Sequence, residues 1–271
     1  MTLAISDGEG LANLLNFPGS KGGNGVWQTI ISEMPPHDLY VEPFCGSAQV
    51  FRRKRRAAAT ILIDSDAAVT AAVIAEYSEG AGTTVICDDG ARWLESNLGR
   101  LNTRTVIYCD PPYLQSTRRD KTPRYYGEHD FTAEQHEDLL RVLSLLTVQR
   151  VPVLLTGYRS DLYDRRLRRW RRVDYPAMTR GGPVTESLWC NFERPWALHD
   201  YRYLGADFRE RERVKRKKAR WRQKLEKLPA LERAAVLDAV NSLSAVIVGN
   251  DDTSCKQKLA EWRQRAGEGT P

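Results

Sequence analysis

The stretch Thr105-Val106-Ile107-Tyr108-Cys109-Asp110-Pro111-Pro112-Tyr113 joins an apolar run to an acidic, proline-rich corner. The apolar run predicts a buried strand of a parallel sheet. Asp110 would then lie at the carboxyl end of that strand, where open α/β sheets bind their ligands. The prolines fix the backbone and remove two N–H donors, so the corner presents hydrogen-bond acceptors. Asp-Pro-Pro is also an ordinary strand breaker, and that interpretation stays open here.

Strand-like and helix-like segments alternate before and after this stretch. Apolar runs at residues 39–41, 60–63, 84–87, 106–109 and 151–155 predict strands, and helical patterns at 66–77, 132–146 and 160–170 separate several of them. Residues 173–175 and 187–192 flank a Gly-Gly-Pro turn and predict a closing hairpin. The alternation predicts an α/β fold with a parallel sheet and helices on both faces.

The composition changes after Tyr203. Residues 209–227 are strongly basic and helix-prone, and their apolar side chains lie near one stripe. Residues 230–247 predict a second amphipathic helix, and residues 255–265 a short third one. We therefore predict an α/β domain over residues 1–203 and a basic helical extension over residues 204–271.

The charge balance favours a polyanionic partner. The 271 residues include 41 Lys and Arg against 35 Asp and Glu, a net charge of +6, and the cations cluster in blocks at residues 52–56, 165–172 and 209–227. The five cysteines form no CxxC pair, which argues against a zinc site or a disulfide framework. No signal peptide or membrane-spanning run is evident, so we expect a soluble protein of a reducing cytoplasm.

Three further segments place ligand-binding chemistry near the same sheet edge. Residues 17–23 are glycine-rich and contain Lys21, although they also fit a flexible lead-in. Residues 42–48 turn from the first strand into a helix, without a GxGxxG or phosphate-loop pattern. Acids follow the second strand (Asp64) and the third (Asp88 or Asp89). Each alone is more often a solvated residue or a helix cap, but together they mark one edge of a crevice.

In this order, the motifs resemble those of the Dam-like DNA adenine-N6 methyltransferases, in the phage and prokaryotic type that lacks the large target-recognition insert. Residues 17–23, 41–47 and 110–113 resemble the opening, glycine and catalytic DPPY motifs of that family. Further similarity runs through residues 131–140, 156–163 and 186–191. The resemblance implies a Rossmann-like sheet that binds S-adenosylmethionine (AdoMet) as methyl donor.

The resemblance also assigns roles to residues. Residues 44–47 and Lys21 would hold the methionine end of AdoMet, Asp64 its ribose, and Asp89 in preference to Asp88 its adenine. Ala48 stands where family members often have Gly. The implied cofactor-binding residues are Phe17, Gly19, Lys21, Glu42, Pro43, Phe44, Cys45, Gly46, Ser47, Asp64, Asp88, Asp89 and Asp110. The implied catalytic residues are Asp110, Pro111, Pro112 and Tyr113, with no metal ligand.

The chemistry of the corner agrees with this assignment. An exocyclic amino group is a poor nucleophile because its lone pair is shared with the ring. Asp110 and the Pro111 carbonyl would accept its two protons and return electron density to the nitrogen. The base would leave the duplex and stack on Tyr113. We predict methylation of adenine N6 in DNA; the alternatives are an N4-cytosine or RNA adenine methyltransferase, and a non-catalytic DNA-binding relative.

Double-stranded DNA is the expected partner, in a prokaryotic cell or a phage-infected host. Residues 113–131 predict a DNA-facing loop, with a plain surface loop as the alternative, and the basic blocks are candidates for phosphate contacts. Only residues 90–105 separate the third-strand acids from the DPPY strand, so we expect short or relaxed sequence specificity. The predicted DNA-binding residues are Arg118, Arg119, Lys121, Arg124, Tyr125, Tyr126 and Arg180.

Overall fold

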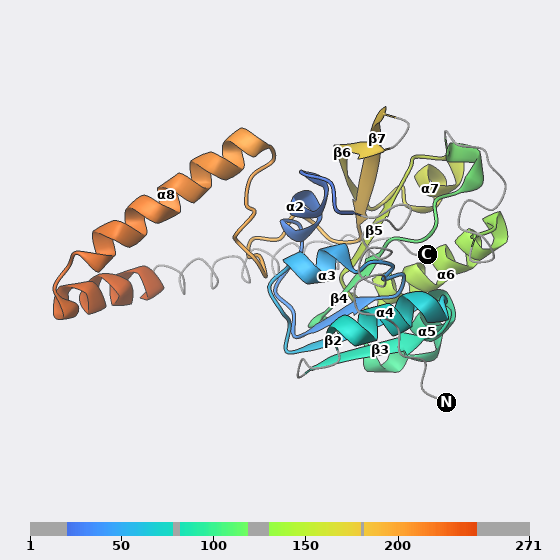
Figure 1. The fold of residues 1–271 in the computed structure, drawn as a ribbon, viewed down its shortest axis with the longest axis horizontal. Helices are drawn as coiled ribbons and strands as arrows, with labels where there is room; N and C mark the ends of the chain where they lie inside the picture. Colours follow the sequence, from blue (N-terminus) through green and yellow to red (C-terminus); the bar gives the residue numbers. More distant parts are fainter. Residues whose placement is uncertain (1–20, 78–81, 119–129, 180–181, 243–271) are drawn as a thin grey trace, which may run out of the picture. The chain divides into compact units, whose positions relative to one another are not determined.

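A seven-stranded sheet in the order β3-β2-β1-β4-β5-β7-β6 forms the centre of the protein (Figure 1). The computed structural model describes residues 21–77, 82–118, 130–179 and 182–242. β1 to β5 pair in parallel, and β7 runs antiparallel to both β5 and β6. The strands are β1 (Leu39–Glu42), β2 (Ala59–Asp64), β3 (Thr83–Cys87), β4 (Thr105–Cys109), β5 (Val153–Gly157), β6 (Arg171–Thr179) and β7 (Gly182–Cys190).

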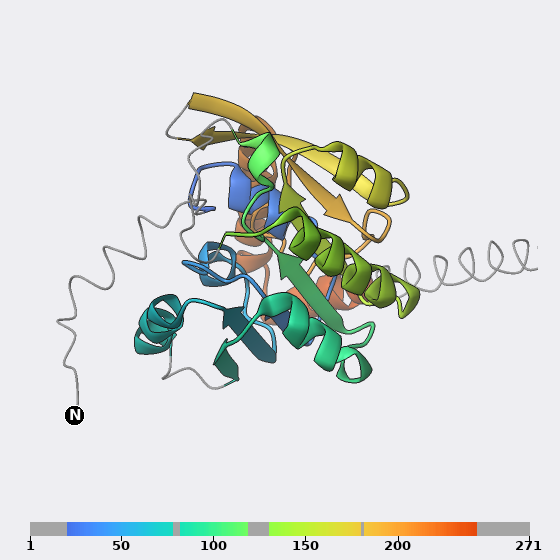
Figure 2. The same cartoon turned by 90° about the vertical axis from the view of Figure 1, so that its right-hand side faces the viewer.

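Helices pack on both faces of this sheet (Figure 2). One face packs against α2 (Val26–Ile31), α3 (Gln49–Arg53) and α4 (Ala67–Tyr77), and the other against α5 (Gly90–Ser96), α6 (Ala133–Val148) and α7 (Asp161–Arg166). Successive strand residues point to opposite faces, so Tyr108 lies in the first core and its neighbour Ile107 in the second. The arrangement is the Rossmann-like α/β fold, with helices on both faces of the sheet, that was predicted from the sequence.

The strand register brings several strand ends to one edge of the sheet. Val41 of β1 pairs with Ile61 of β2 and with Ile107 of β4, and Cys109 pairs with Leu155 of β5. Because these strands are parallel, the residues that follow them emerge on the same side. The predicted ligand-binding segments therefore share the carboxyl edge, as expected.

Most predicted element boundaries are confirmed within two residues, but α7 is shorter than expected. The hairpin strands β6 and β7 are longer than the predicted 173–175 and 187–192. A capping box begins α6: the Thr132 hydroxyl accepts from the Gln135 amide at 3.2 Å, and the Gln135 side chain accepts from the Thr132 amide at 2.8 Å. α7 was expected over residues 160–170 and ends at Arg166. The side chain of Leu167 is buried in the core there, and β6 begins at Arg171.

The chain divides by its internal contacts into residues 1–211 and 212–271. α8 (Phe208–Glu226) is one continuous helix through this point, and none of its residues is buried. The predicted basic helix is thus confirmed, and residues 230–242 are also helical. The third predicted helix, at 255–265, lies outside the described residues. In the described part of the chain, no helix has the length and apolar content that crossing a bilayer requires.

Candidate active site

Asp110 lies at the carboxyl end of β4 and is held by two neighbours. The Thr156 hydroxyl, from β5, donates to Asp110 Oδ1 at 2.8 Å. The Lys21 ammonium lies 2.9 Å from the same oxygen, and the Asp110 side chain keeps 16% of its surface exposed. The carboxylate is therefore fixed in direction while part of it remains accessible.

Lys21 joins Asp110 to the tyrosine of the DPPY corner. Its ammonium donates to the Tyr113 hydroxyl at 2.7 Å and lies 3.6 Å from Glu186 Oε2 on β7. The Lys21 side chain is buried. A buried cation between two carboxylates is strongly held, because opposite charges interact more strongly where water is excluded.

Glu186 and Tyr175 complete this cluster and were not predicted as site residues. Glu186 Oε2 accepts from the hydroxyl of Tyr113 at 2.9 Å and from that of Tyr175 at 3.0 Å. Tyr175 and Glu186 are paired across the β6–β7 hairpin. The sequence analysis placed this hairpin in the sheet and counted residues 186–191 among the resembling segments, but it assigned no role to either side chain. The alternation along residues 173–175 would point Tyr175 to one face.

Burial is the main influence on the pKa values of Asp110, Tyr113 and Tyr175. Burial raises the pKa of Asp110 above its ordinary value, Lys21 opposes that rise, and the charge of Glu186 adds to it. Burial also raises the pKa of Tyr113 and of Tyr175 well above the ordinary range. The two tyrosines therefore remain protonated hydrogen-bond donors at neutral pH.

The glycine turn after β1 lies against the acid that ends β2. Gly46 has a φ of 47°, in the left-handed region, and its amide donates to Asp64 Oδ2 at 2.8 Å. The other oxygen of Asp64 accepts from the Asp66 amide at 3.0 Å. Ala48 also adopts a left-handed conformation, with a φ of 49°. The turn therefore keeps a glycine-like backbone despite the Ala.

The acids after β3 lie beside this turn. The Asp88 amide donates to the Asp64 carbonyl at 3.0 Å, and Asp88 forms an ion pair with Arg92. Asp89 is the N-cap of α5 and accepts from the Arg92 amide at 2.7 Å. A Cβ added at Gly90 would lie 2.0 Å from the Pro43 carbonyl oxygen, so only Gly permits this approach of α5 to the β1–α3 loop.

The remaining predicted residues of the glycine motif point mostly into the core. Glu42 is buried and accepts from the Tyr40 hydroxyl at 2.9 Å, and burial raises its pKa to about 8. Cys45 and Ser47 are also buried. Phe44 packs edge-on against Phe131, with ring centroids 5.6 Å apart. These side chains support the loop, and its backbone is the part that a ligand can approach.

Of the residues predicted to bind DNA, the structure describes only Arg118. Arg118 is buried and forms an ion pair with Asp130, and its guanidinium donates to the Tyr113 carbonyl at 2.5 Å. Arg118 therefore braces the chain after Tyr113, which differs from the exposed position expected for a DNA contact. The other predicted site residues, Phe17, Gly19, Arg119, Lys121, Arg124, Tyr125, Tyr126 and Arg180, lie outside the described residues.

Comparisons with known proteins give only distant structural similarity. No protein-family model and no curated protein matches the sequence. A precorrin 8W decarboxylase from Methanobacterium thermoautotrophicum is 13% identical (TM-score 0.40; 66% of this chain and 95% of that chain covered). A SAM-dependent methyltransferase from Agrobacterium tumefaciens is 13% identical (TM-score 0.38; 60% and 58% covered). A dimethyladenosine transferase from Plasmodium falciparum is 12% identical (TM-score 0.41; 60% and 60% covered). We draw nothing about activity from similarities this low.

Proposed function

We propose that this chain is an AdoMet-dependent methyltransferase that modifies the N6 amino group of adenine in double-stranded DNA. The placement of Asp110 carries the proposal: a partly exposed carboxylate at the end of β4, fixed by Thr156 and Lys21. Asp64 lies at the same sheet edge, beside the glycine turn. The sequence motifs supply the choice of adenine and of DNA.

Residues at the same edge of the sheet as Asp110 fit the cofactor. Gly46 has a left-handed backbone and no Cβ, so a ligand can approach the turn closely. Asp64, which accepts from the Gly46 amide, offers carboxylate oxygens of the kind that accept hydrogen bonds from ribose hydroxyls. Lys21 provides a cation for the carboxylate of the methionine end. When bound, AdoMet would supply an electrophilic methyl carbon at this edge.

Asp110 acts on the amino group of the target base. Its carboxylate accepts one amine proton in a hydrogen bond, which increases the electron density on the nitrogen. It then stabilises the positive charge that develops on that nitrogen, before a proton is released to water. Partial burial makes this stabilisation stronger than it would be in bulk solvent.

Glu186 acts as a positioning residue in this proposal. Lys21 lies against Oδ1 of Asp110, and its positive charge weakens the hydrogen bond that the same carboxylate can accept from the target amine. Glu186 Oε2, 3.6 Å from Lys21, provides the ammonium with a second acceptor once the amine arrives. Tyr113 and Tyr175 hold the Glu186 carboxylate in place for this exchange.

The substrate is tested with methyl-labelled AdoMet and three nucleic acids: a DNA duplex, single-stranded RNA, and a DNA duplex in which inosine replaces every adenine. We expect label in the first DNA duplex alone, recovered after digestion as N6-methyladenine. Label in the adenine-free duplex, recovered as N4-methylcytosine, or label in RNA alone would reject the proposed substrate. Sequencing of methylated plasmid would then test the short or relaxed specificity, which a single fixed site of four or more bases would contradict.

A further inference from the structure

One face of α8 is rich in cations, with Glu210 as the acid near its beginning. Residues three, four, seven and eleven positions apart lie on the same side of a helix, and Arg213, Arg216, Lys217, Arg220 and Lys224 follow this spacing. All five side chains are exposed. We call this set the cationic face; at about 1.5 Å per residue it extends for roughly 16 Å along the helix.

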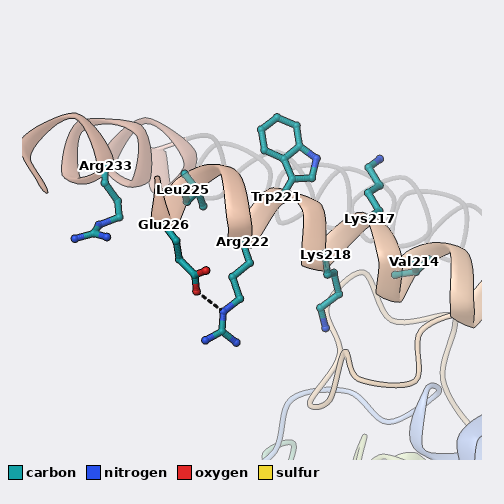
Figure 3. A pocket seen from close by; sticks show the side chains of 8 residues that line it. All are labelled: Val214, Lys217, Lys218, Trp221, Arg222, Leu225, Glu226 and Arg233. Carbon is teal, nitrogen blue, oxygen red and sulfur yellow. Dashed lines mark hydrogen bonds and ion pairs between the residues drawn. The ribbon is translucent and has the colours of Figure 1, made fainter. Parts of the chain in front are cut away.

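The other sides of α8 have a different character. Val214, Trp221 and Leu225 line a groove to which Arg233 of the next helix also contributes (Figure 3). The acids that follow Arg211 in α8 are bound by other cations, because Glu226 accepts from Arg222 at 2.8 Å and Glu212 lies 3.5 Å from Lys215. The cationic face borders this groove: Lys217 also lines it, and the Lys224 ammonium lies 5.1 Å from the centre of the Trp221 ring.

The other two basic blocks are bound within the fold. In residues 52–56, Arg52 forms an ion pair with Glu76, and Lys54 is buried. In residues 165–172, Arg166 lies 2.9 Å from Glu137, and Arg171 lies 2.7 Å from Glu33. Several cations of these blocks thus serve internal contacts, whereas no residue of α8 is buried.

We propose that the cationic face of α8 binds the phosphate backbone of duplex DNA without reading its bases. A row of exposed cations matches a regular row of phosphates, and such contacts give affinity and orientation but no sequence information. The inference rests on the proposed function for the choice of DNA. In this inference α8 supplies affinity for DNA. A large recognition insert would otherwise supply that affinity.

A matched pair of full-length variants tests this surface. Arg216→Gln/Arg220→Gln/Lys224→Gln removes three cations from the cationic face, and Lys215→Gln/Lys218→Gln/Arg222→Gln removes three from the rest of the helix. Both variants have the same net charge and the same added residue type. Circular dichroism checks that the helical content is equal.

Binding is measured by fluorescence anisotropy of a labelled duplex without AdoMet, over a range of salt concentrations. Each phosphate contact contributes about 0.9 to the slope of log affinity against log salt. We expect the first variant to lose about two to three units of slope and at least roughly tenfold in affinity near 100 mM salt. The control variant should keep the wild-type slope and stay within about twofold of the wild-type affinity.

Equal losses in both variants would reject the cationic face in favour of a general charge effect, and an unchanged slope in the first variant would also reject it. Stronger binding to vesicles of phosphatidylglycerol than to the duplex would reject DNA as the ligand. The binding assay involves no methyl transfer. A chain without activity that shows the slope change would therefore refute only the proposed function, and an active chain without the slope change only this inference.

Discussion

Lys21 and Glu186 set the electrostatic balance at Asp110. The Glu186 charge raises the pKa of Asp110, and Glu186 is also the second acceptor for Lys21. Activity requires ionised Asp110, so it should fall as pH drops through this raised pKa. The acid limb of the pH profile therefore reports the state of Asp110.

Glu186→Gln should change both the pKa of Asp110 and the hydrogen bonding of Lys21. Loss of the charge lowers the pKa of Asp110, which moves the acid limb of kcat/KM to lower pH. Lys21 also stays on Asp110 and weakens its hydrogen bond to the amine, so kcat/KM near neutral pH should fall roughly tenfold. Tyr175→Phe is the control: it removes one hydrogen bond to Glu186 but keeps the charge. An acid limb that stays in place in Glu186→Gln would contradict this account.

Ala48 tolerates a conformation that suits Gly. Its φ of 49° costs an L-residue about 1–2 kcal/mol, and a β-branched side chain more. Ala48→Val should therefore lower the free energy of unfolding by about 2 kcal/mol or more. Ala48→Gly should stay within about 1 kcal/mol of wild type, because relief of strain offsets the entropy of Gly. Urea titration measures both, and equal stability of the Val variant would show that the backbone is not constrained.

At the scale of elements, the approach of α5 to the β1–α3 loop depends on Gly90. A Cβ at this position would meet the Pro43 carbonyl at 2.0 Å, which forces backbone to move. Gly90→Ala should lower the free energy of unfolding by about 2 kcal/mol and raise the Kd for AdoMet several-fold. Gly99→Ala is the matched control, because nothing lies within 4 Å of its added Cβ. Similar effects of the two substitutions on AdoMet binding would contradict the packing argument.

Elements were largely predictable because they follow from local patterns. The β-rich run before Asp110 and the Thr132 capping box appear in short windows of sequence, and both are present. Contacts between distant segments were not predictable in this way. The Tyr113–Glu186 hydrogen bond joins β7 to the end of β4, and its pairing depends on where the hairpin lies in the sheet.

The partners of the basic residues were hard to predict for the same reason. Net charge and clustering identify cations but do not show which of them have acidic partners in the fold. Arg118 looked like part of an exposed loop, and its ion pair with Asp130 depends on where the chain returns to the sheet. The cations of α8 were easier to predict. The spacing of residues along one helix already determines which side chains share a face, without any tertiary contact.

At the scale of the whole α/β unit, the stability should depend on pH through Glu42. Burial raises its folded pKa to about 8, so the folded chain keeps a proton that the unfolded chain releases above about pH 4.5. The free energy of unfolding therefore falls as pH rises from 5 to 7, by about 2 kcal/mol from this group. Glu42→Gln removes the titrating group and should flatten the slope. Parallel slopes for the two chains in urea titrations would contradict the assignment.

The most direct test of the account is methyl transfer by Asp110→Ala, measured with labelled AdoMet on an adenine-containing duplex. We predict that transfer falls by about a thousandfold or more, while the Kd for AdoMet changes only a few-fold and the thermal transition is retained. Transfer at the wild-type rate by a folded Asp110→Ala chain would contradict the central claim that this carboxylate activates the amine.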